Sequence, residues 1–131
     1  MIRRLDFWRQ QGGAAAAEFA LVLPVFFALI LGVINVSLLA YFNANLHFAV
    51  DDAARCMSVN PAVVTHSCSS SASTQSHALA NFNYPSLNPS FTAVSASCGD
   101  KVSGTANFNV NAVVISVPVT LSATSCFPLQ D

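Results

Sequence analysis

A long uncharged stretch near the N-terminus constrains this chain more than any other feature. No Asp, Glu, Lys or Arg occurs between Glu18 and Asp51, and residues 19–42 are almost continuously apolar. Such a segment, of roughly 24 residues, rises about 36 Å as an α-helix and can cross a hydrocarbon core of about 30 Å with some tilt. A soluble chain of 131 residues cannot supply the core that would bury such a helix on all sides. We therefore expect residues 19–42 to span a membrane.

The charges on either side of the apolar run predict its orientation. Arg3, Arg4 and Arg9 precede the run, whereas Asp51 and Asp52 follow it. Positive charge is retained on the cytoplasmic side of a membrane segment, so the N-terminus is expected inside and the residues after about 45 outside. The net charge of −1 and the lack of a basic patch give no indication of a nucleic-acid partner.

All four cysteines follow the apolar run, at Cys56, Cys68, Cys98 and Cys126. An even number of cysteines on the expected outer side is typical of two disulfides in an oxidising compartment. Three pairings are open. We favour Cys56–Cys68 and Cys98–Cys126, because each closes a short loop within one expected structural unit; free buried thiols are the alternative.

The remaining pattern predicts an α+β fold. Helix-forming alanines, the apolar run and then apolar residues at three- and four-residue spacing predict one helix over 14–57, ended by the Asn60-Pro61 pair. A short helix is expected near Gln75–Phe82. Alternating apolar and polar residues predict three antiparallel strands near 91–97, 104–110 and 117–126. Residues 58–131 would then form a small disulfide-linked domain whose sheet covers the amphipathic end of the long helix.

The junction before the apolar run has an unusual order of residues. A basic leader over residues 1–13 ends at Gly13, four alanines follow, and Glu18 is the last charged residue before the run. A carboxylate at the edge of a membrane segment is costly unless it is paired, which makes Glu18 a candidate functional residue. A cut after Gly13 would make Glu18 the fifth residue, able to pair with the new α-ammonium of Ala14 or of a neighbouring chain and to lie at the positive end of the helix dipole. Such a pair would help to set the register of bundled helices.

This part of the chain resembles the type IV pilin superfamily, and most closely the TadE-like pseudopilins of tight-adherence (Tad/Flp) pilus systems. The residues that carry the resemblance are Gly13-Ala14-Ala15-Ala16-Ala17-Glu18-Phe19-Ala20-Leu21-Val22-Leu23-Pro24, the apolar run, and Asp52-Ala53-Ala54-Arg55. The resemblance covers residues 12–57. It implies that a prepilin peptidase cuts between Gly13 and Ala14 at the inner face of the membrane, and that Glu18 is the carboxylate used in assembly.

The resemblance also implies partners and a location. The partners would be other pilins or pseudopilins and the inner-membrane assembly platform, and the chain would cross the inner membrane once or enter a pilus filament. Fibre subunits of these systems are much shorter and usually have Tyr after the Glu, where this chain has Phe19 and a substantial outer domain. The resemblance therefore implies a minor subunit rather than the abundant fibre subunit.

Three small or helix-breaking residues within the apolar run affect how its helix can pack. Pro24 removes one backbone hydrogen bond and is expected to kink or loosen the helix, unless it is an ordinary tolerated membrane proline. Ala28 and Gly32 form a small-xxx-small pair that lets another helix approach closely, although small residues are common in membrane helices.

No arrangement typical of an enzyme is found, and no cofactor is expected. The sequence has no Gly-rich phosphate loop and no nucleophile elbow. His47, His66 and His77 do not combine with Cys56 and Cys68 in a standard zinc spacing, so no metal is expected. Two other functions stay open: an unprocessed, signal-anchored envelope protein whose outer domain binds a partner, and a secreted domain. The three functions differ in how many N-terminal residues are removed. Prepilin processing removes about 13 residues, a signal anchor loses none, and secretion removes about 44.

Overall fold

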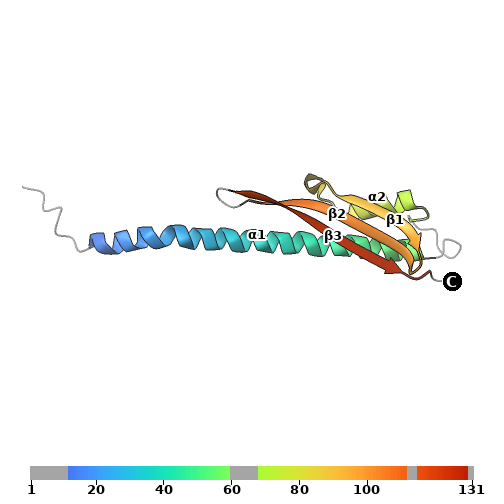
Figure 1. Cartoon of the computed structure of the whole chain (residues 1–131), viewed down its shortest axis with the longest axis horizontal. Helices are drawn as coiled ribbons and strands as arrows, with labels where there is room; N and C mark the ends of the chain where they lie inside the picture. The colour runs from blue at the N-terminus through green and yellow to red at the C-terminus, as the bar shows by residue number, and fades with distance from the viewer. Residues whose placement is uncertain (1–11, 60–67, 112–114, 130–131) are drawn as a thin grey trace, which may run out of the picture. The chain divides into compact units, whose positions relative to one another are not determined.

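The computed structural model describes residues 12–59, 68–111 and 115–129 (Figure 1). The helices are α1 (Gly12–Ser58), α2 (Ser71–Asn81) and the short 3-10 helix η1 (Pro85–Leu87), and the strands are β1 (Ser90–Ala96), β2 (Gly99–Asn111) and β3 (Ser116–Phe127). This order of elements confirms the α+β class, the short second helix and the three-stranded antiparallel sheet. Most of the leader, the Asn60-Pro61 pair and His66 lie outside the described residues.

The chain divides into two compact units, residues 1–34 and residues 35–131. In the first unit, α1 exposes large apolar side chains on every side, with Leu21 at 79% and Phe19 at 66% of full exposure. An apolar surface of this extent is stable only in contact with another apolar phase. Within the described residues, α1 is the one helix that is long and apolar enough to cross a membrane.

The second unit gives α1 a buried face. Leu46, Ala49, Val50, Ala53 and Ala54 recur at three- and four-residue spacing, and each is at most 1% exposed. Three of these residues are alanines, whose short side chains let the sheet approach the helix closely. The amphipathic half of α1 therefore packs against the sheet, as the sequence pattern predicts.

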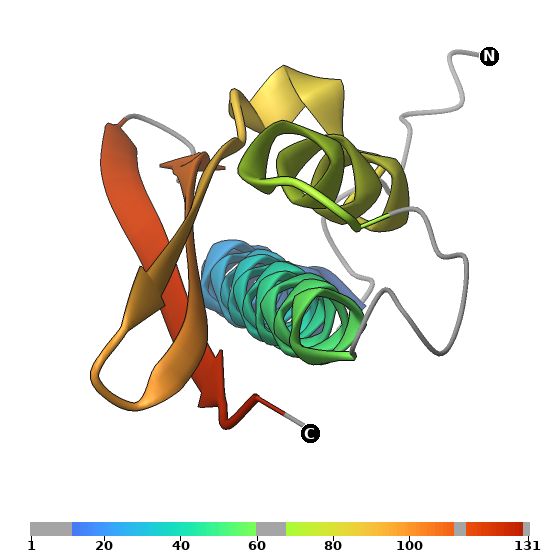
Figure 2. The ribbon, with the colours of Figure 1, turned by 90° about the vertical axis from the view of Figure 1, so that its right-hand side faces the viewer.

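The sheet has the order β1-β2-β3, and both pairs of neighbouring strands are antiparallel. Alternate residues of β2 point toward α1: Val102, Gly104, Ala106 and Phe108 are all buried. Figure 2 shows the sheet on one side and both helices on the same face of it. One helical layer and one sheet layer thus enclose a single core, and the other face of the sheet is left open.

Strand β2 begins at Gly99, earlier than the sequence pattern predicts. The turn lies at Ser97-Cys98, so that Gly99 already pairs with Ala96. Gly99 has a φ of +117°, and a Cβ there would lie 2.1 Å from the carbonyl oxygen of Phe127. Only glycine fits this combination of backbone angle and close approach, and it allows the hairpin to close in two residues.

Helix α2 begins at Ser71 rather than near Gln75. Ser70 is its N-cap, and its hydroxyl accepts a hydrogen bond from the backbone N–H of Ser73 at 3.2 Å, while the Ser73 hydroxyl accepts from the N–H of Ser70 at 2.9 Å. This reciprocal capping box satisfies two otherwise unpaired donors and starts the helix in a serine-rich segment that reads as a loop. The helix places Ala78, and the C-cap residue Phe82, in the core.

Two disulfides tie the second unit together. Cys56 near the end of α1 is bonded to Cys68, just before α2, and Cys98 in the β1–β2 turn is bonded to Cys126 in β3. These pairs coincide with the pairing that the sequence favours. No free cysteine remains among the described residues.

Candidate functional site

The residues singled out at the start of the apolar run lie in the first two turns of α1. The helix begins at Gly12, so the bond between Gly13 and Ala14 lies within its first turn. Gly13 is exposed, and a Cβ built on it would have nothing within 4 Å.

Glu18 is exposed in the second turn of the uncut helix, and no acidic residue lies in the first turn. Within the part of the chain that the structure describes, no cation or hydrogen-bond donor contacts its carboxylate. The side chain is therefore placed on an apolar surface with its charge available to a group from outside this unit. Its exposed neighbours Phe19 and Val22 are apolar.

The three packing residues of the apolar run lie on the same exposed helix. Pro24 is inside α1, and the helical assignment continues without interruption on both sides of it. Ala28 and Gly32 are exposed one turn apart, and a Cβ at Gly32 would meet nothing within 4 Å. These two small side chains leave room for a second helix to approach the backbone of α1 closely. The kink at Pro24 and the helix contact remain predictions.

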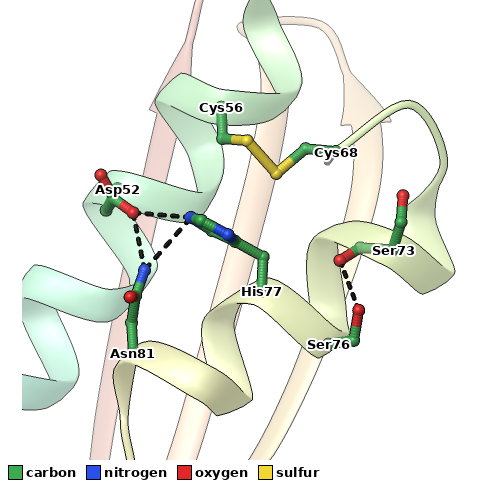
Figure 3. Close-up of polar contacts among 7 residues, drawn as sticks. All are labelled: Asp52, Cys56, Cys68, Ser73, Ser76, His77 and Asn81. Atoms are coloured by element: carbon green, nitrogen blue, oxygen red, sulfur yellow. Dashed lines mark hydrogen bonds and ion pairs between the residues drawn. A yellow bond between two sulfur atoms is a disulfide. The ribbon is translucent and has the colours of Figure 1, made fainter. Parts of the chain in front are cut away.

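A polar cluster in the second unit joins α1 to α2 (Figure 3). Oδ2 of Asp52 on α1 lies 2.8 Å from Nε2 of His77 and accepts a hydrogen bond of 2.7 Å from Nδ2 of Asn81, both on α2. His77 and Asn81 are four residues apart and therefore face α1 from adjacent turns. Taken by itself, His77 in the sequence suggests only a metal ligand, whereas its i, i+4 spacing from Asn81 is the signal that points to a shared partner.

Beside this polar cluster lie three side chains of the types that bind metals. The ligand atoms of Cys56, Cys68 and His77 all lie within 4.8 Å of one another. However, the two sulfur atoms are bonded to each other, and the histidine Nε2 already contacts Asp52. A disulfide sulfur is a poor substitute for a thiolate, which is the form in which cysteine binds metals. The cluster thus links two helices rather than holding a metal ion.

An aromatic cluster fixes the residues at the end of the expected membrane span. The ring of Phe42 lies 5.0 Å from that of Tyr84 and 5.3 Å from that of Phe108, measured between centroids. The hydroxyl groups of Tyr41 and Tyr84 are 2.9 Å apart. This hydrogen bond, followed by desolvation, raises the pKa of Tyr84 above its ordinary value of 10.0. The outer domain therefore contacts α1 at Tyr41 and Phe42 through edge-to-face and tilted ring pairs, a contact that no local sequence pattern indicates.

Comparison with known proteins finds a family match for the N-terminal part of the chain. Residues 13–55 match the model of the TadE-like protein family, which confirms the resemblance over these residues and is consistent with a TadE-like pilin of the Tad system. No curated protein and no solved structure matches the chain.

Proposed function

From the premise that residues 13–55 are similar to the TadE-like proteins, we propose that the chain is a minor pseudopilin. A prepilin peptidase removes the leader by cutting between Gly13 and Ala14, and the mature subunit takes part in assembling a Tad-type pilus or a related secretion machine. The observation that carries the proposal is the order of residues at the start of α1. A glycine, four alanines and one exposed carboxylate lead directly into an exposed apolar helix.

Glu18 is proposed to guide assembly. After cleavage it is the fifth residue of the mature chain, and the new α-ammonium group of a neighbouring subunit can pair with it. In an apolar surrounding an unpaired carboxylate costs several kcal/mol, and an ammonium partner offsets much of that cost. Correct register between two helices is then the arrangement in which every carboxylate has an ammonium partner.

The apolar helix and the disulfides support the proposed location. A helix exposed and apolar over residues 19–34 fits a membrane anchor, and the arginines before it favour a cytoplasmic N-terminus. Two disulfides in the second unit fit an oxidising compartment outside the cytoplasm. The subunit is thus proposed to cross the inner membrane once before it enters the assembly, with the assembly platform and other pilins as partners.

The first experiment measures the N-terminal residue and the mass of the protein isolated from its native membrane. The wild-type chain is expected to begin at Ala14, and a Gly13→Arg variant is expected to keep Met1. A Gly12→Arg variant is the matched control, since it makes the same change one residue before the cut and should still be processed. An intact Met1 in the wild-type protein, in cells whose prepilin peptidase is active, would reject the proposal and leave an unprocessed membrane-anchored protein.

A second experiment separates assembly from processing. Glu18→Gln keeps the size of the side chain and removes its charge, so the variant should be cut after Gly13 and yet fail to co-purify or crosslink with the other pilins. Glu18→Asp, which keeps the charge on a shorter side chain, should retain part of this association. Equal association of the wild-type and Glu18→Gln chains would show that the carboxylate has no role in assembly.

A further inference from the structure

The end of the β2–β3 hairpin is apolar and exposed. The two strands pair as far as Asn111 and Ser116, and the pair before that is Val110 and Val117. Val117 is 51% exposed and Ile115 is 66% exposed. Further along the same face of β3, Leu121 is only 7% exposed because it packs into the core. The apolar face of β3 that packs on α1 at Leu121 thus becomes exposed at Val117 and Ile115.

This end of the hairpin lies beside α1 within the uncharged stretch. Nδ2 of Asn35 donates a hydrogen bond of 3.3 Å to the carbonyl oxygen of Asn111. Asn35 follows Ile34 directly and belongs to the segment 19–42 that the sequence predicts to span the membrane. In Figure 1, β2 and β3 run along the second unit's part of α1, with this end toward the lower residue numbers of the helix. The apolar end of the hairpin is therefore held at the level where the apolar run continues.

The composition of the hairpin favours lipid headgroups and the outermost acyl chains over water or a charged protein surface. No Asp, Glu, Lys or Arg occurs between Lys101 and Asp131. The outward face carries Asn107, Asn109 and Asn111, which are polar but uncharged. Asparagine side chains and unpaired edge backbone are too costly for the hydrocarbon centre, yet they suit the interfacial layer where water and headgroups supply hydrogen bonds.

We propose that the end of the β2–β3 hairpin, with Ile115 and Val117 as its contact residues, rests in the outer interface of the bilayer that α1 spans. The proposal rests on the membrane anchoring that is part of the proposed function. It places the outer limit of the spanning helix near Asn35 instead of Phe42. A helix over residues 14–34 rises about 31 Å, which matches a hydrocarbon core of about 30 Å without tilt. Lipid is the favoured contact because anchoring by α1 alone brings this surface to the bilayer, with no additional partner.

The test places a single tryptophan at the hairpin end of the full chain. Trp8 is the only tryptophan, so a Trp8→Phe background leaves the introduced residue as the sole emitter. Ile115→Trp is compared with Val94→Trp, a matched control on β1 where the valine is 53% exposed. Both proteins are reconstituted into vesicles of phosphatidylethanolamine and phosphatidylglycerol, with and without lipids brominated in the upper part of the acyl chains. Intact disulfides and unchanged circular dichroism check the fold, and Val117→Trp replaces Ile115→Trp if that variant does not fold.

Bromolipid quenching is expected to be several-fold stronger for the tryptophan at 115 than for that at 94, with blue-shifted emission at every protein-to-lipid ratio. Weak, equal quenching of both in chains that float with the vesicles overturns the hairpin contact and leaves the anchor intact. Failure of the chain to float with vesicles overturns the anchor and, with it, the proposed function. A blue shift that appears only at high protein-to-lipid ratio indicates contact with a second copy of the chain, and it overturns the lipid contact.

Discussion

Gly104 of β2 is packed tightly against β1 and α1, and its substitution by alanine tests the packing of the second unit. Gly104 lies on β2 opposite Phe91 of β1. A Cβ at this position would lie 2.6 Å from Cε1 of Phe91 and 2.9 Å from Cγ2 of Val50 on α1. Phe91 is 6% exposed and Val50 is 1% exposed, so neither side chain has free space into which it can retreat.

The cost of Gly104→Ala follows from these distances. The Phe91 ring must move by about 0.8 Å before the contact reaches 3.4 Å, where ordinary van der Waals contact begins. Forcing one extra methyl group into a filled core typically costs about 1–3 kcal/mol. Alanine returns about 0.5–1 kcal/mol, because it loses less backbone entropy than glycine on folding. The expected net loss in the free energy of unfolding is therefore about 1–2 kcal/mol, or roughly 5–10 °C in Tm for a unit of this size.

The assay is thermal and urea unfolding of the full chain in detergent micelles, followed by circular dichroism in the β-sheet region. Thr105→Ala, at the next, outward-facing position of β2, is the control and should change stability by no more than about 0.5 kcal/mol. In a Phe91→Leu background, where the ring is gone, Gly104→Ala should cost less than it does in the wild-type chain. A Gly104→Ala protein at least as stable as the wild type would refute the reasoning, since it would mean that the ring and the helix do not occupy this space.

Three further changes have defined expectations. Leu46→Ala removes a fully buried side chain and should lower the free energy of unfolding by about 2–5 kcal/mol, measured by urea titration. Replacing Cys98 and Cys126 by alanine opens a loop with a sequence separation of 28. In the chain-entropy model this lowers the free energy of unfolding by about 3.6 kcal/mol. A variant with the same free energy of unfolding as the oxidised wild type would contradict that model. Tyr41→Phe leaves Tyr84 as the only tyrosine, and an ultraviolet pH titration should show its pKa lowered toward 10.0. Since the raised pKa favours the neutral phenol in the folded chain, the stability that this hydrogen bond contributes is expected to be lost as the pH rises through the folded-state pKa.

The parts of this structure that sequence reasoning predicts are those with a local pattern. The composition of residues 19–42 alone predicts an apolar helix. The alternation of apolar and polar residues along 117–126, with a period of two, predicts β3. Helix α2 starts earlier than the sequence predicts, because the run from Ser70 to Ser73 is typical of a loop, whereas its hydroxyl groups cap the helix. Strand β2 also starts earlier than the sequence predicts, since Gly99 follows the turn and already pairs with Ala96.

The parts that could not be predicted are contacts between residues far apart in the chain. Asp52 and His77 are separated by 25 positions, and Asn35 and Asn111 by 76. Neither pair belongs to any repeating pattern, because each arises only after the helix and the sheet have packed. The hydrogen bond of Asn35 changes the interpretation of the apolar run most, as it places the residues from Asn35 to Phe42 beside the outer domain.

The Cys56–Cys68 disulfide determines how a pulling force would travel through the subunit. A subunit drawn out of a bilayer by its helix must carry its outer domain along, and the backbone link between them runs through the residues after α1. Unconstrained, a separation of 12 residues can stretch to roughly 40 Å before it transmits tension. The disulfide holds the two Cα atoms 5.7 Å apart, so load passes directly from the end of α1 into the start of α2. The end of α1 and the start of α2 are then coupled with almost no slack, and the work of extraction is not spent on extending the connection between them.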